Sequence, residues 1–199
     1  MNGLRIDETD EELAHEVQAG NVSSLEILVT RYHSLLLRYV CGMCHDYHLS
    51  QDIVQECFVR VISRIGQYRY PEPFSPWIFA IARNLVRDHA KSGSARREFP
   101  AGDRLPDDSS SEDAISERWE RQAVLEALER LPHTCREVLV LRYYGDLSLE
   151  AIARTLEIPV GTVKSRLSRA VHELAKFLES PQKEVEHSAG IPREKAAQR

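Results

Sequence analysis

The sequence lacks any apolar run long enough to cross a bilayer, and its first residues, MNGLRIDETDEEL, carry acids instead of a signal-peptide core. We therefore expect a cytoplasmic protein with no membrane insertion. Cysteine is also scarce, because Cys41, Cys44, Cys57 and Cys135 are too few and too clustered for a disulfide scaffold in a chain of 199 residues. Reduced thiols are the default expectation.

Basic residues are in the minority, with 26 Lys and Arg against 31 Asp and Glu and a formal charge of −5. Nonspecific affinity for DNA comes mostly from neutralised phosphates. A protein of this charge that binds DNA must therefore gather its cations locally or act with a partner.

Strand-like alternation is scarce too, whereas helix-forming residues are spread evenly and Gly and Pro mark the breaks. We expect an all-α protein of two small helical domains, an N-terminal helix bundle and a C-terminal helix-turn-helix, joined by a flexible acidic linker. No nucleophile–base pairing, phosphate loop or paired carboxylates stand out in the sequence. We therefore expect a protein that is not an enzyme and has no cofactor.

Local signals place the helices of the bundle. Thr9 with Glu12, and Ser23 with Glu26, have capping-box spacing, and Gly20 is placed to close the first helix. A third helix is predicted from about residue 50 to 65, with Ile62 among its inward positions. Ser75 and Pro76 predict the cap and first turn of a fourth. In the C-terminal domain, Thr134 with Glu137 has the same capping-box spacing.

The stretch LSLEAIARTLEIPVGTVKSRLSRAV, from Leu147 to Val171, predicts two short helices around a tight turn. Ser148 is a plausible N-cap for the first. Pro159 cannot continue that helix but suits the start of another, so the chain should turn across Glu157 and Ile158 and restart near Val160. This arrangement is typical of a helix-turn-helix that reads DNA.

The second of these helices has two distinct faces. Apolar residues share one face, namely Val163, Leu167, Ala170, Val171 and Leu174. Small polar side chains and cations occupy the rest, which fits the major groove. The predicted base and phosphate contacts are Thr162, Lys164, Ser165, Arg166, Ser168 and Arg169.

A second candidate DNA site lies between the third and fourth helices. Aromatic residues crowd one turn-rich segment, namely Tyr68, Tyr70, Phe74 and Trp77. Arg83, Arg87 and Lys91 follow at i, i+4 and i+8, beside Asn84. Aromatic rings stack unpaired bases and cations hold phosphates, so the combination favours single-stranded DNA over a core aromatic beside a solvated face.

Cys41, Cys44, His45 and His48 spell CxxCHxxH. The first five residues match the string for covalent haem attachment, which needs an exported chain and is therefore rejected. A zinc or redox site and an incidental surface cluster both stay open, although four tetrahedral ligands from one continuous helix are geometrically awkward. We expect no metal.

Three segments together resemble one family: DIVQECFVRVISRI, PWIFAIARNLVRDHAK and LPHTCREVLVLRYYGDLSLEAIARTLEIPVGTVKSRLSRA. Their order and spacing are similar to bacterial RNA polymerase sigma factors of the sigma-70 family, in the extracytoplasmic-function (ECF) group. Glu157 stands where many relatives have glycine. If the turn needs a left-handed backbone at this position, the glutamate would cost on the order of 1 kcal/mol of stability.

The resemblance implies roles for named positions. Asp52, Gln55 and Glu56 match the surface for the clamp helices of core RNA polymerase. The loop Tyr68 to Phe74, including Arg69, and the helix bearing Trp77, Arg83, Asn84, Arg87 and Lys91 match the elements that open and read the minus-ten element. The helix VGTVKSRLSRA matches the reader of the minus-thirty-five element. An anti-sigma factor is a further expected partner, since the family is commonly held inactive by one.

The implied organisation is sigma region 2 over residues 1–91, a linker over 92–118, sigma region 4 over 119–180 and a disordered tail over 181–199. The function implied is that of a transcription initiation factor, which binds core polymerase, selects a promoter class and promotes melting. The rival hypothesis is an autonomous helix-turn-helix regulator whose N-terminal bundle senses a ligand or dimerises. The aromatic loop and basic stripe discriminate, because a duplex-only binder has no use for them.

Overall fold

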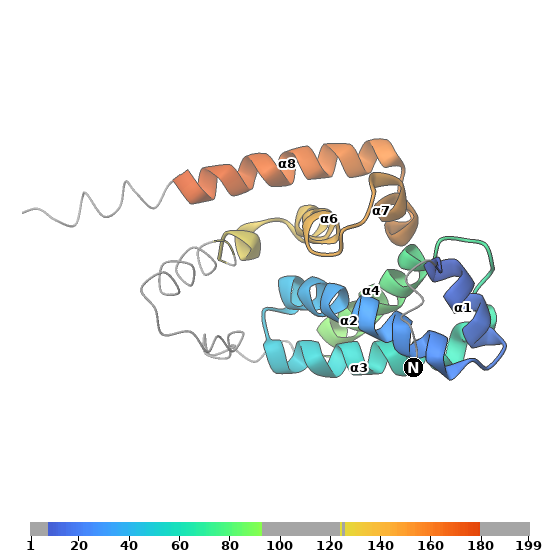
Figure 1. The fold of residues 1–199 in the computed structure, drawn as a ribbon. Coiled ribbons are helices and arrows are strands. Elements are labelled where there is room, and N and C mark those ends of the chain that lie inside the picture. Colours follow the sequence, from blue (N-terminus) through green and yellow to red (C-terminus); the bar gives the residue numbers. More distant parts are fainter. Residues whose placement is uncertain (1–7, 93–123, 125, 180–199) are drawn as a thin grey trace, which may run out of the picture.

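A computed structural model describes residues 8–92, 124 and 126–179, and within these ranges every regular element is helical (Figure 1). The N-terminal half holds α1 (Asp10–Gln18), α2 (Val22–Cys44), α3 (Tyr47–Arg64), the 3-10 turn η1 (Ile65–Gln67) and α4 (Phe74–Lys91). A helical turn over 126–130 leads into α6 (His133–Tyr143), α7 (Leu149–Leu156) and α8 (Val160–Glu179). The predicted all-α class is confirmed.

None of the helices in the described ranges has the length and apolar character needed to span a membrane. The predicted linker over 92–118, apart from Ser92, and the predicted tail over 181–199 lie outside the described residues. The division into two domains therefore stays a prediction.

Helix α1 begins as its capping box predicts: the Glu12 amide donates to Thr9 Oγ1 at 3.2 Å and the Thr9 amide donates to Glu12 at 2.9 Å. The predicted box of Ser23 with Glu26 is wrong. The side chain of Asn21 caps α2 instead, accepting from the Ser23 amide at 3.1 Å. Ser24, the residue after Ser23, is buried, and its hydroxyl donates a hydrogen bond to the Glu16 carboxylate of α1.

Two further helix starts lie earlier than predicted. Asp46 caps α3 by accepting from the Leu49 amide at 2.9 Å, so α3 begins at Tyr47 and not near residue 50. Helix α4 begins at Phe74, one residue before the predicted cap, Ser75. In each place a residue outside the sequence signal accepts a hydrogen bond from one of the first free amides of the helix, Asp46 for α3 and Glu11 for α4.

The C-terminal half follows its local signals except at one helix start. Ser148 caps α7 by accepting from the Ala151 amide at 3.1 Å, and α8 restarts at Val160, as predicted. The predicted box of Thr134 with Glu137 is wrong, since α6 has Pro132 at its N-cap and no side-chain cap. Glu137 instead lies buried against α4 of the other half.

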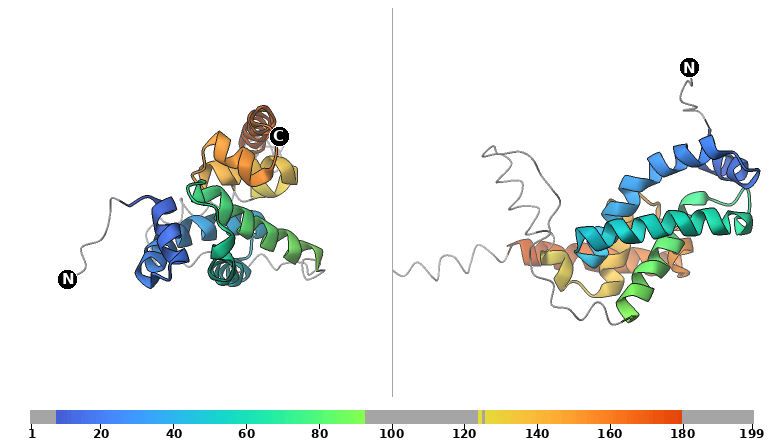
Figure 2. Two further views of the ribbon diagram at one scale, coloured as in Figure 1. Left: turned by 90° about the vertical axis from the view of Figure 1, so that its right-hand side faces the viewer. Right: turned by 90° about the horizontal axis from the view of Figure 1, so that it is seen from below.

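The two halves pack directly on each other, α6 against α2 and α7 against α4 (Figure 2). Glycine permits the closest approaches: a Cβ on Gly42 would meet Val140 Cγ1 at 2.9 Å, and one on Gly145 would meet Phe79 at 3.1 Å. The buried apolar side chains accordingly form one continuous core through both halves. We refer to this contact between the halves as the seam.

The turn between α7 and α8 uses a left-handed residue, as expected if the position suits glycine. Glu157 has φ 56° and ψ 44°. We predict that Glu157→Gly raises the free energy of unfolding by about 0.5–1 kcal/mol, because glycine removes the Cβ clash of this conformation but adds freedom to the unfolded chain. Urea unfolding checks this. Glu157→Ala keeps the clash and is the matched control, so equal gains from both variants would contradict the explanation.

Candidate nucleic-acid interface

Helix α8 presents the surface that the sequence predicts for duplex DNA. Val163 and Ala170 are fully buried against the preceding helices, which fixes the rotation of α8. On the outer face Lys164, Ser165, Ser168 and Arg169 are exposed, and Thr162 and Arg166 are half-buried. Further along this helix Glu173 forms an ion pair with Lys176, with Oε1 and Nζ 3.1 Å apart. Four of the six predicted reading side chains are thus fully accessible on α8, and the other two are partly accessible.

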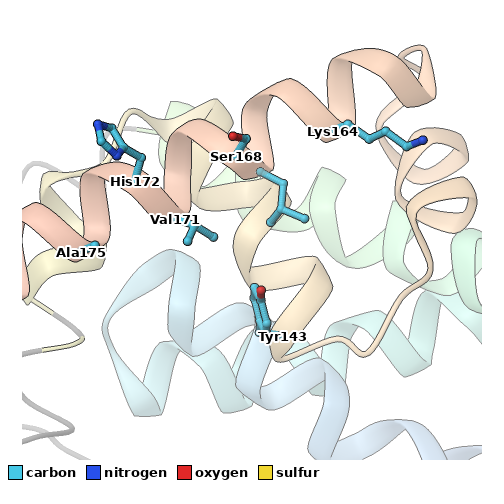
Figure 3. Close-up of a pocket in the computed structure, with 7 residues that line it drawn as sticks. Tyr143, Lys164, Ser168, Val171, His172 and Ala175 are labelled. Carbon is cyan, nitrogen blue, oxygen red and sulfur yellow. The ribbon is translucent and has the colours of Figure 1, made fainter.

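Val171 departs from its predicted place in the core, with 45% of its surface exposed. It lines an open groove between α6 and α8, opposite Tyr143, which is 66% exposed (Figure 3). Lys164, Ser168 and His172 line the same groove. The predicted DNA-reading face therefore adjoins an apolar surface.

The aromatic segment divides into a buried and an exposed part. Tyr68 is 4% exposed and Phe74 is fully buried, and their rings meet edge to face at 5.6 Å. Burial raises the pKa of the Tyr68 phenol to about 12, and its hydroxyl donates to the Glu72 carbonyl. The prediction that these two rings stack on bases is therefore corrected, because neither offers an open face.

Tyr70 and Trp77 are the predicted aromatic residues that remain accessible. Tyr70 is 48% exposed, and one face of its ring stacks on His15 of α1 with centroids 4.8 Å apart. Trp77 is half-buried and meets the edge of Tyr68 at 5.6 Å. The loop from residue 65 to 74 therefore carries one candidate stacking ring, Tyr70, and the first turn of α4 carries the other, Trp77, above a base formed by Tyr68 and Phe74.

Sequence reasoning missed the α1 side chains that hold this loop. Gln18 Nε2 donates to the carbonyls of Ile65 and Tyr68, both at 2.7 Å. Glu11 Oε1 accepts from the Phe74 amide at 3.0 Å. These partners lie 47 to 63 residues apart in sequence, so no local spacing signal exists for them.

The basic stripe on α4 is split by the seam. Asn84, Arg87 and Lys91 are exposed, along with Arg69 of the loop. Arg83, in contrast, points at the other half, with its Nε 2.9 Å from Oε1 of Glu137. Glu137 is 4% exposed, so this ion pair is largely shielded from water. In this arrangement Arg83 is not available to DNA.

The ridge predicted to contact polymerase lies on the outer face of α3. Asp52, Gln55 and Glu56 are all exposed, and Glu56 accepts from Arg60 Nε at 2.9 Å. Ile62 was predicted to point inward but is 52% exposed, and Val59 is 59% exposed. An acidic ridge thus lies beside two unburied apolar side chains on one helix.

The cysteine and histidine cluster does not form a single helical face. Helix α2 ends at Cys44, His45 caps it in a left-handed conformation, and His48 already belongs to α3. Burial raises the pKa of the Cys44 thiol to about 12 and also raises that of Cys41, so the metal-binding thiolate is disfavoured. No three His, Cys, Asp or Glu side chains gather as possible metal ligands among the described residues.

His45 instead faces the seam. Arg136 of α6 lies 3.1 Å from its Nε2, and Glu129 lies 3.7 Å from its Nδ1. Burial lowers the pKa of His45, and Arg136 lowers it further against the opposing effect of Glu129. Part of the cluster therefore serves the packing of the two halves.

Comparisons with known proteins agree with this arrangement. Residues 28–96 match the family described as Sigma-70 region 2, and residues 121–174 match Sigma-70, region 4. The RNA polymerase sigma-H factor of Pseudomonas aeruginosa is 31% identical over 183 residues, which cover 86% of this chain and 95% of the relative. The ECF RNA polymerase sigma-E factor of Escherichia coli K12 is 32% identical over 177 residues, covering 81% of this chain and 90% of the relative.

The fold has a similar solved structure, that of CnrH in complex with the cytosolic domain of CnrY. The superposition has a TM-score of 0.70, with 25% identity, and covers 87% of this chain and 99% of that one. The similarity therefore extends across both halves.

The division of the aromatic segment gives a stability prediction. Tyr68→Ala should lower the free energy of unfolding by about 3 kcal/mol, because it opens a cavity under the loop. Tyr70→Ala should change it by no more than about 0.5–1 kcal/mol, because its ring lies at the surface. Urea unfolding at neutral pH measures both. Equal and small losses would contradict the core position of Tyr68.

Proposed function

This chain belongs to the ECF group of the sigma-70 family, whose members are transcription initiation factors of RNA polymerase, and we propose that its two halves read two separate promoter elements. The observation that carries the proposal is the presence of both surfaces in one acidic chain: the cationic face of α8, and the exposed Tyr70 and Trp77 beside Asn84 and Arg87. A formal charge of −5 fits a factor for which the polymerase supplies most of the nonspecific DNA affinity.

Helix α8 reads the minus-thirty-five element as duplex DNA. Its exposed Lys164, Ser165, Ser168 and Arg169 form hydrogen bonds with base edges, and Arg166 binds phosphates. The buried Val163 and Ala170 support this by fixing which face turns outward.

The loop from 65 to 74 and helix α4 open and read the minus-ten element. Tyr70 and Trp77 stack unpaired bases, Asn84 contacts a base edge, and Arg69, Arg87 and Lys91 hold the phosphates. Arg83 can join them only after Glu137 releases it, because the guanidinium edge that pairs with this carboxylate cannot bind a phosphate at the same time. Tyr68 and Phe74 act from beneath as supports.

Helix α3 binds core polymerase through Asp52, Gln55 and Glu56. Its exposed neighbours Val59 and Ile62 support this role, since an apolar centre with a charged rim is typical of a binding surface. RNA synthesis itself is the work of the polymerase, so this chain has no catalytic residues. Acting with the polymerase, it is a cytoplasmic protein.

An anti-sigma factor is the second protein partner that we propose. The similar protein CnrH was solved with the cytosolic domain of CnrY bound to it. We infer that a comparable regulatory protein holds this chain inactive until its signal arrives.

The autonomous regulator is the less favoured hypothesis. Its N-terminal bundle would need a ligand site or a dimer surface, whereas here that bundle carries an accessible aromatic loop and an acidic ridge. Both features are explained by single-stranded DNA and by polymerase.

Charge reversal on α3 tests the polymerase contact. Asp52→Lys should weaken binding to core polymerase at least about tenfold, and Glu56→Lys should weaken it further. The reason is that the acidic ridge is expected to meet a basic surface of the polymerase, which a lysine would repel. Glu26→Lys on α2 makes the same charge change at an exposed site and should bind as the wild type. Fluorescence anisotropy gives the affinities and circular dichroism checks the fold. If Asp52→Lys and Glu26→Lys bind alike, the proposed contact is wrong.

A single cation on α8 tests the reading of the minus-thirty-five element. Arg169→Ala should weaken promoter binding by about 1–3 kcal/mol and relax the preference at one base position. Lys176→Ala, two turns further along the helix, should leave the preference intact. Holoenzyme binding to all single-base variants of the element measures this. An unchanged preference in Arg169→Ala would assign Arg169 to phosphate binding.

A further inference from the structure

Helix α1 lies outside the part of the chain that matches sigma region 2, which begins at residue 28, yet it contacts the promoter-reading loop directly. We propose that α1 is a positioning element for that loop, with Gln18, Glu11 and His15 as the positioning residues. The inference rests on the proposed role of the loop from 65 to 74 in reading the minus-ten element, and it explains how that loop keeps its shape.

Helix α1 is itself firmly docked. Asp10 accepts hydrogen bonds from Arg31 Nη1 and from the Tyr32 hydroxyl, both at 2.6 Å, and both donors come from α2. Leu13 and Ala14 are fully buried in the core. Side chains on the rest of the helix can therefore hold a neighbouring segment in place.

Gln18 fixes the start of the loop. One amide nitrogen donates to the carbonyls of Ile65 and Tyr68, and the Tyr68 amide also donates to the Ile65 carbonyl at 3.0 Å. Because two carbonyls can only accept, the NH2 group of Gln18 must face them. Its oxygen then faces His15 Nδ1, 3.2 Å away, so this ring nitrogen must carry the proton.

His15 connects this network to the exposed ring. Oriented by Gln18, it stacks on Tyr70 with an interplanar angle of 24°. Nearly half of the Tyr70 side chain stays exposed, so a base can stack on the face that His15 leaves open. The result is a ring held at a set angle without a bond of its own to the core.

Glu11 fixes the other end of the loop. Helix α4 has Pro73 at its N-cap and no local side-chain cap, and the Phe74 amide donates to Glu11 of α1 instead. A carboxylate at a helix N-terminus also opposes the positive end of the helix dipole. Both ends of the loop are thus tied to a single helix.

The test uses base preference, which a change in the amount of folded protein does not alter. Holoenzyme made with the full chain transcribes a pooled library of duplex promoters with a randomised minus-ten element, in which each variant carries its own tag in the transcribed region, and the tags in the transcripts are sequenced. The measured quantity is the ratio of transcript yield between the best and the worst base at a minus-ten position. We expect this ratio to fall roughly tenfold in Gln18→Glu, which loses both hydrogen bonds that the Gln18 amide donates. It should fall about fivefold in His15→Ala, which loses the stacked ring.

Matched controls separate positioning from charge and from stability. Gln67→Glu adds the same charge to an exposed site at the same loop, and His33→Ala removes an exposed histidine from α2, so both should keep the wild-type preference. His15 is exposed, and its alanine variant should bind core polymerase and unfold as the wild type does. It therefore decides the question even if Gln18→Glu folds poorly.

Two results would overturn the inference, and they are distinguishable. If the wild type shows a minus-ten preference that Gln18→Glu and His15→Ala retain, α1 has no positioning role while the proposed function stands. If the wild type itself shows no minus-ten preference, the proposed reading loop is wrong, and the role of α1 is wrong with it.

Discussion

The absence of a side chain at Gly42 is the constraint on which the arrangement of the two halves depends. A Cβ there would lie 2.9 Å from Val140 Cγ1, so α6 can approach α2 this closely only because the residue is glycine. In the same arrangement α7 packs on α4, Glu137 pairs with Arg83, and Arg136 lies against His45.

Apolar contacts, not charges, hold this seam. Moving a carboxylate and a guanidinium out of water costs about as much as their attraction returns, so the Arg83–Glu137 pair adds little net stability. The Tyr39 hydroxyl is buried nearby without a hydrogen-bond partner. Burial raises its pKa, chiefly because the phenolate would have no water, so it stays neutral. The polar groups of the seam therefore contribute less to its stability than the apolar contacts do.

Charge is separated across the surface in a way that suits an acidic protein that binds DNA. Exposed cations lie on α8, at Lys164, Arg169 and Lys176, and at the end of α4, at Arg87 and Lys91, whereas exposed acids lie together on α3, at Asp52 and Glu56. Each surface can then meet a partner of the opposite charge without interference from the net charge of −5. The same chain thus fits both DNA and a protein.

The sequence predicted those features whose physical cause is local. The box at Thr9, the cap at Ser148 and the turn before Pro159 each depend on residues within a few positions, and each is confirmed. The box at Ser23 failed because the neighbouring Asn21 takes the cap. The box at Thr134 failed because Glu137 pairs instead with Arg83, 54 positions away.

The same distinction applies to the candidate sites. The exposed positions of the α8 face and the α3 ridge follow from helical periodicity, although Val171 and Ile62, which were predicted to point inward, are exposed as well. The roles of these surfaces stay predictions. Aromatic content alone could not show that Tyr68 and Phe74 pack inward while Tyr70 points out, because that choice depends on α1 and α4 meeting around the loop. The ties from Gln18 and Glu11 have no signal in the sequence for the same reason.

The most direct measurement of the central claim, that this chain selects promoters only as part of a polymerase, is run-off transcription with each protein omitted in turn. We expect transcripts from a defined start only when the chain and core polymerase are combined. Alone, the chain should bind duplex promoter DNA weakly and with a steep dependence on salt. Tight and specific duplex binding by the free chain, unchanged when polymerase is added, would contradict a role as a sigma factor and favour an autonomous regulator.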